Sequence, residues 1–145
     1  MPFRFPLAAV LLVREHAETR EERALKKIQI DVARTSRQVE ELNTAMTHAH
    51  DARERALQEL IPSFQLHHYQ RQIEEATEKK KALLHQLQIL RQELGRQLKV
   101  YQAAHRDREA LTGMLQEQRA AYEQEQARAQ QKQVDDMFMA RRHRR

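Results

Sequence analysis

The sequence lacks the residues that compact folds depend on. It has no cysteine and no tryptophan, and its 145 residues include only 2 glycines, 3 prolines and 5% aromatics. The absence of cysteine excludes disulfides and thiol chemistry. A globular domain of this length normally has more turn-forming residues and more aromatic side chains for its core. Mean hydropathy is −0.90, so we expect most side chains to be solvated.

Helix-forming residues are abundant where turn-forming and aromatic residues are scarce. Charged residues make up 32% of the chain, and Ala, Glu, Lys, Leu, Arg and Gln dominate, which is typical of long helices and coiled coils. Pro2 and Pro6 fit an entry into a helix, so Pro62, in "LIPSFQLHHY", marks the one credible turn. We predict helices over about 7–59 and about 64–140, a turn at 60–63 with Ser63 as N-cap, and a basic tail at 141–145.

Apolar residues recur at alternating three- and four-residue spacings along both predicted helices, as in a coiled-coil seam. The seam residues include Leu11, Leu25, Val32, Val39 and Leu42, then Ile73, Leu83, Leu87, Leu90 and Leu94. Glu18, Lys80, Gln97 and Arg108 interrupt this pattern.

One turn between two seams predicts an all-α fold: a long antiparallel helical hairpin, 1–145 as a single domain and a monomer. Leu25 would then lie near Leu98, and Leu7 near Gln116. The second helix, roughly 110 Å long against roughly 80 Å for the first, would overhang. Two glycines inside the second helix, Gly95 and Gly113, would mark bends or a close approach of the helices.

The apolar run from Phe5 to Val13 raises the question of an export signal or a membrane anchor. Arg4 is a thin basic region, no small-residue cleavage site follows the run, and the run is far shorter than the 20 or so residues of a span. We therefore expect it to begin the first helix.

Catalytic and metal-binding patterns are missing. The eight histidines include His48 with His50 and the adjacent pair His67 and His68, but these spacings do not suit a metal site. The sequence has no phosphate-binding loop and no nucleophile motif. We expect no enzyme activity, no metal and no cofactor.

Charge is concentrated at the end of the chain. Of the formal net charge of +5, four charges belong to Arg141, Arg142, Arg144 and Arg145, which leaves +1 for the rest. Such a run is either a solvated tail or a docking tip for acidic groups or phosphates. A nucleic-acid-binding coiled coil therefore stays open as an alternative, as does a structural spacer or homodimer, although basic residues do not line one face. We expect no nucleic-acid partner.

The two ends of the chain resemble those of the FliJ family. The opening "PFRFPLAAVLLVREHAETREERAL", the closing "QKQVDDMFMARR" and Tyr69-Gln70 after the turn are similar to the family's pattern in order and position. The resemblance implies a two-helix coiled coil like the stalk of the rotary ATPase γ subunit. It implies a soluble cytoplasmic component of flagellar type III export, held at the inner membrane by its partners. Injectisome stalk proteins share the layout and stay open as an alternative.

The resemblance also implies partners and sites. The end with both termini would bind the hexameric export ATPase FliI, which works with FliH, and another surface would bind the export gate protein FlhA, with export chaperones as further possible partners. For the ATPase ring we predict Phe3, Phe5, Leu7, Leu11, Met137, Phe138, Arg141 and Arg142, a surplus of apolar and basic residues for a two-helix seam. For the gate we predict Gln38, Leu42 and Tyr69. Ala45, Ala49 and Gln72 stand where the family often has aromatics.

Overall fold

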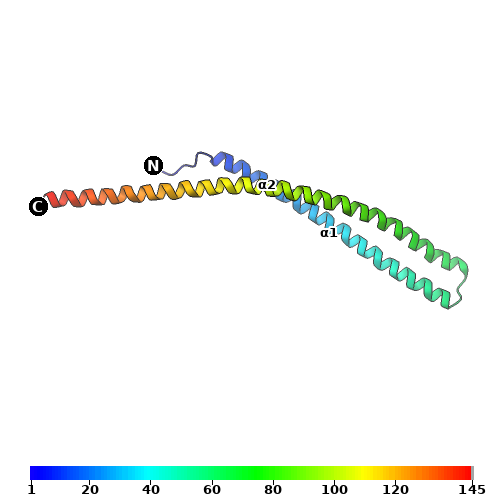
Figure 1. Cartoon of the computed structure of the whole chain (residues 1–145). Helices are drawn as coiled ribbons and strands as arrows, with labels where there is room; N and C mark the ends of the chain where they lie inside the picture. Colours follow the sequence, from blue (N-terminus) through cyan, green and yellow to red (C-terminus); the bar gives the residue numbers. More distant parts are fainter. Residues whose placement is uncertain (145) are drawn as a thin grey trace. The chain divides into compact units, whose positions relative to one another are not determined.

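The computed structural model describes residues 1–144, and in this range it contains two helices and no strand. Helix α1 spans Ala8–Gln58 and α2 spans Ser63–His143. The helices pack against each other (Figure 1), which confirms the predicted all-α helical hairpin. With 81 residues against 51, α2 is much the longer helix.

Two of the predicted boundaries differ from the observed ones. Helix α2 continues through His143, so Arg141 and Arg142 are helical rather than part of a tail. Cations in the last turn of a helix interact favourably with its dipole, which explains the extension. At the other end Ser63 is the first residue of α2, and the carbonyl of Pro62 accepts a hydrogen bond from the N–H of Gln65 at 3.1 Å. Arg145 lies outside the described residues.

The hairpin divides into two compact units. The turn unit comprises residues 21–100, and the termini unit comprises residues 1–20 with residues 101–144. Buried side chains of the turn unit are Leu25, Thr35, Val39, Ala56, Ile73 and Leu87, and Leu11 is buried in the termini unit. All seven occupy the heptad positions expected of the seam, so the predicted packing faces are confirmed.

The turn itself ends α1 with a hydrogen-bonded cap. The N–H of Ile61 donates to the carbonyl of Ala56 at 3.2 Å, and Leu60, one residue earlier, has a φ of 53°. This six-to-one bond around a left-handed residue is a Schellman motif, in which glycine is the usual left-handed residue. Leu60 is 91% exposed, so its side chain contributes no packing that would offset the backbone strain.

Close approach of the helices at the two glycines is not observed. A β-carbon at Gly95 or Gly113 would have no other part of the structure within 4 Å, and neither residue has a positive φ. Of the two expectations for these glycines, the close approach of the helices was therefore wrong, and the bend stays a prediction.

Candidate functional sites

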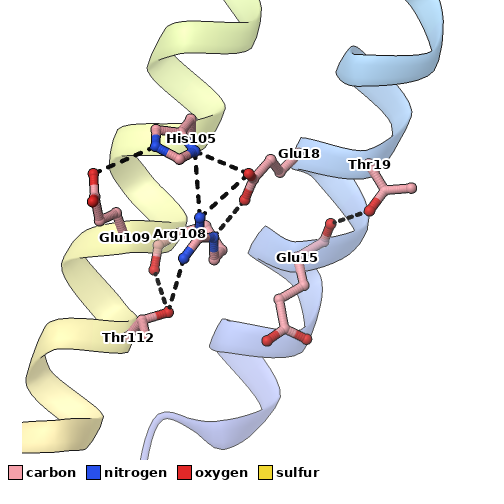
Figure 2. Close-up of polar contacts among 7 residues, drawn as sticks. All are labelled: Glu15, Glu18, Thr19, His105, Arg108, Glu109 and Thr112. Carbon is pink, nitrogen blue, oxygen red and sulfur yellow. Dashed lines mark hydrogen bonds and ion pairs between the residues drawn. The ribbon is translucent and has the colours of Figure 1, made fainter.

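A polar cluster occupies the seam of the termini unit (Figure 2). Arg108 Nε donates to Glu18 Oε2 at 2.5 Å, and His105 Nδ1 lies 3.0 Å from Glu18 Oε1. The side chains of Glu18 and Arg108 are only 16% and 24% exposed. The hydrogen bonds from Arg108 and then His105 lower the pKa of Glu18, and Glu18 in turn raises the pKa of Arg108.

Three of the residues that interrupt the apolar seam therefore have polar partners on the other helix: Glu18, Gln97 and Arg108. Gln97, another interrupting residue, donates through Nε2 to the side chain of Glu21 at 2.6 Å and to its backbone carbonyl at 3.1 Å. The contact of Glu18 with His105 agrees with the predicted antiparallel register, because Glu18 lies seven residues before Leu25 and His105 lies seven residues after Leu98. The carboxylate of Glu18 is bound by Arg108 and His105 of the other helix, so its role is to pair the two helices. Across residues 1–144, acidic and histidine side chains form no group of three or more that could hold a metal ion.

The N-terminal residues predicted for ring binding pack on α2. The hydroxyl of Tyr122 donates to the carbonyl of Met1, the rings of Phe3 and Tyr122 lie 5.5 Å apart, and the guanidinium of Arg119 is 5.6 Å from the centre of the Phe3 ring. We call these four residues the aromatic clasp. Phe3, Phe5 and Leu7 are half-buried and Leu11 is 9% exposed, so this set helps to hold the hairpin together.

The C-terminal residues predicted for ring binding are fully accessible. Every described residue after Tyr122 is exposed, with Met137 at 64% and Phe138 at 66%. Arg141 lines a shallow depression with Met137 and Phe138, so cationic and apolar groups share one surface. Phe138 lies roughly 24 Å along α2 from Tyr122. The structure therefore separates the predicted ring-binding residues into a packed N-terminal set and an exposed C-terminal set.

The three residues predicted for the export gate lie along one surface of the turn unit. Leu42 lines a groove of about 440 Å³ with Tyr69, and an adjoining groove of about 600 Å³ with Gln38. Gln38 is exposed, whereas Leu42 and Tyr69 are half-buried. We call the two adjoining depressions the Leu42 groove. Ala45, Ala49 and Gln72, the positions without family aromatics, line the depression of about 440 Å³ that Tyr69 also lines.

Sequence reasoning missed Lys79 and Leu83, which line the Leu42 groove from α2. The register that places Leu25 near Leu98 also places Leu42 near residue 81, so counting along the seam would have found both. It missed Arg119 and Tyr122 as well, although the same register places the first residues of the chain near position 120.

Hydropathy along α1 and α2, taken over the described residues, reaches nowhere the length and apolarity that a membrane crossing needs.

Comparison with curated proteins and with solved structures gives no match. A family model described as "FliJ: Flagellar FliJ protein" matches residues 3–145, essentially the whole chain. The match includes both terminal segments that carry the resemblance, and it is to the flagellar family, whereas the sequence left injectisome stalk proteins open. The chain therefore belongs to the FliJ family and is a component of the flagellar type III export apparatus.

Proposed function

We propose that this protein is a coiled-coil stalk that links the export ATPase to the export gate. The C-terminal end of α2 binds the FliI hexamer, which works with FliH, and the Leu42 groove binds FlhA. These partners hold the protein at the cytoplasmic side of the inner membrane, at the base of the flagellum. Export chaperones are further partners, and the protein acts as a monomer without catalytic activity of its own.

The observation that supports ATPase binding best is the composition of the exposed end of α2. Met137, Phe138 and Arg141 are grouped on a helix that no other described part of the chain covers. Aromatic residues, Met and Arg are enriched at the centres of protein interfaces. A preformed helix loses less conformational entropy on docking than a disordered tail would. Arg141 and Arg142 can make paired, directional hydrogen bonds to carboxylates in a ring.

Support for gate binding comes from the Leu42 groove. Its lining combines small and aliphatic side chains, among them Leu42, Ala45 and Leu83, with polar groups such as Gln38, Glu41 and Lys79. In a docking groove the apolar lining supplies affinity and the polar groups set the orientation of the partner. Small side chains at positions 45 and 49 leave room for a partner's side chains to enter.

The first test measures ATP turnover by purified FliI hexamer with the full-length chain or with a chain ending at Met137. We expect the shortened chain to stimulate turnover several-fold less, with the helicity of the remainder preserved because the aromatic clasp is intact. Phe138→Ala should reduce stimulation, whereas Phe64→Ala, at an equally exposed phenylalanine in the turn, should not. Equal stimulation by full-length and shortened chains would reject ATPase binding through this end.

A finer comparison concerns the terminal charges. Replacement of Arg144 together with Arg145, the latter outside the described residues, should weaken stimulation less than the deletion does. That smaller effect should diminish at high salt because exposed charges are screened.

The gate contact is tested separately by binding to the cytoplasmic domain of FlhA. Gln38→Ala and Tyr69→Ala should weaken binding and motility while the melting curve stays nearly unchanged, and Gln124→Ala, at an exposed glutamine far along α2, serves as control. Leu42→Ala should also cost stability, about 2 kcal/mol for a half-buried leucine. Wild-type affinity in both the Gln38 and Tyr69 variants would refute the assignment.

A further inference from the structure

The first 17 residues of the termini unit form a distinct arm that lies on α2 between about residues 105 and 122. Its outer end is held by the aromatic clasp, and its inner end is adjacent to the cluster of Glu18, His105 and Arg108. We propose that residues 1–17 are a releasable arm, which opens from α2 as a unit while the turn unit stays folded. This inference does not depend on the proposed function.

Fewer side chains are buried under the arm than in residues 25–45 of α1, which contain Leu25, Thr35 and Val39. Leu11 is the one buried side chain of the arm, and on α2 the described residues from 101 to 122 include no buried side chain. The turn unit buries Leu25, Val39 and Leu87 among others. Segments with few buried apolar contacts open locally at low free-energy cost, so we expect the arm to open at a lower cost than residues 25–45.

The cluster of Glu18, His105 and Arg108 lies where the arm joins the rest of α1, and we expect opening of the arm to end there. When apolar seam residues separate, their surface enters water without compensation. The polar groups of Glu18, His105 and Arg108, by contrast, can exchange one another for water, which offsets part of the cost of separating them. The pair Arg14–Asp107, at 3.2 Å with both side chains about half exposed, is of the same kind. Separation can therefore proceed from the N-terminus to this cluster without a large cost.

The outer end depends on very few contacts. The hydroxyl of Tyr122 donates to the carbonyl of Met1, and the ring of Tyr122 packs against the ring of Phe3. The guanidinium of Arg119 lies over the Phe3 ring. Loss of the Phe3–Tyr122 contact thus frees the outermost residues of the arm, whereas Phe5 and Leu7 keep their partial burial. Each contact of the aromatic clasp involves the side chain of Phe3 or Tyr122.

Opening changes what α2 can offer to a partner. With the arm closed, the part of α2 without a neighbouring helix begins after Tyr122. With the arm open, it begins near Arg108, which still pairs with Glu18, and the half-buried side chains of Leu111 and Leu115 become accessible. The arm therefore controls the length of unpaired helix and the amount of apolar surface at this end.

Hydrogen exchange on the full-length chain, read by mass spectrometry, tests the proposal. Amides of residues 8–17 should exchange at least about tenfold faster than those of residues 25–45, in line with a lower opening free energy. Phe3→Ala and Tyr122→Phe should each accelerate exchange in the arm several-fold and leave residues 25–45 unchanged. Phe64→Ala, which removes an exposed ring at the turn, should alter neither segment.

A reversible lock makes the test independent of destabilising variants. Because the chain has no cysteine, Phe3→Cys with Tyr122→Cys introduces a single possible disulfide across the clasp. Oxidation should slow exchange in residues 8–17, and reduction should restore it. The proposal is overturned if the wild-type arm exchanges as slowly as residues 25–45, if the clasp variants accelerate both segments equally, or if the formed disulfide leaves arm exchange unchanged.

Discussion

Glu18 and Arg108 place charges where a coiled coil normally has apolar residues, and each is the other's partner. Such a pair specifies register more than it adds stability. Sliding one helix by a heptad would set Glu18 against Tyr101 or Leu115, the seam neighbours of Arg108, and leave a carboxylate without its cation. Antiparallel helices with otherwise similar apolar seams are thereby held to one alignment.

Acid should remove the contribution of Glu18. Because hydrogen bonds from Arg108 and His105 lower its pKa in the folded chain from the ordinary 4.5, its stabilising effect is present above about pH 4.5 and is lost as pH falls through the folded value. Glu18→Gln should therefore lower stability at pH 7, on the order of 1 kcal/mol for a pair partly open to solvent. Thermal melts from pH 7 to 3 should show this gap closing. Glu123→Gln, at an exposed site, should show no gap, and a gap for Glu18→Gln that stays constant with pH would contradict the assignment.

The two glycines of α2 offer a second test at single residues. Since a β-carbon would meet nothing within 4 Å at either site and both residues are helical, alanine should fit without strain. Gly95→Ala and Gly113→Ala should each stabilise the protein by about 0.5–1 kcal/mol, because glycine loses more backbone entropy in a helix. Urea unfolding measures the change, and the reverse substitution Ala110→Gly, at an exposed helical site, should destabilise by a similar amount. Unchanged or lower stability in both alanine variants would mean that the glycines have a packing role.

At the scale of the elements, α1 and α2 are joined by a cap whose left-handed residue is a leucine. Ile61 is half-buried and Ala56 is 2% exposed, and these are the two positions that usually pack together in such a cap. The remaining cost lies in Leu60, whose β-carbon is unfavourable at positive φ.

Leu60→Gly should therefore stabilise the hairpin, by about 1 kcal/mol, since almost no side-chain burial is lost. Leu60→Asn should gain less, and Leu60→Val should lose stability because a β-branched residue fits positive φ poorly. Chemical denaturation of the three variants gives the order. A less stable glycine variant would indicate that Leu60 makes a contact that outweighs its backbone strain.

At the scale of the whole molecule, nearly all burial comes from one seam between two helices. The accessible surface is 12044 Å², against about 7,800 Å² for a globular monomer of this mass. Little interior is available to enclose a substrate, and much surface is available to partners. Stability then depends on the two helices of one chain meeting each other rather than those of another copy.

Cross-linking at high dilution tests that pairing. Cysteines at Glu21 and Gln97, whose side chains are in contact, should be joined within one chain by a short bifunctional maleimide. Because the cross-link lies within one chain, the cross-linked protein should run at the mass of a monomer on a denaturing gel. A cysteine at Glu21 paired with one at Glu74, on a remote part of α2, should not be joined. Products of twice the mass would show that helices pair between chains.

The sequence by itself determined the two helices, the turn at Pro62 and the buried faces, including Leu25, Val39, Ile73 and Leu87. A heptad pattern is local, and each helix needs only one partner, so spacing and a single proline were sufficient. The same pattern did not show that α2 continues through His143, because helix ends depend on weak terminal interactions.

Tertiary structure alone decided which polar residues meet. Glu18 and Gln97 read as defects in their own helices, and only the register across the seam supplied Arg108 and Glu21 as partners. That register also carried Phe3 to Tyr122 and left Phe138 exposed, although sequence had grouped both at one tip. These contacts join residues 76 to 119 positions apart. The register set by the turn brings such residues to the same level of the hairpin, but only the packed side chains decide which polar groups meet.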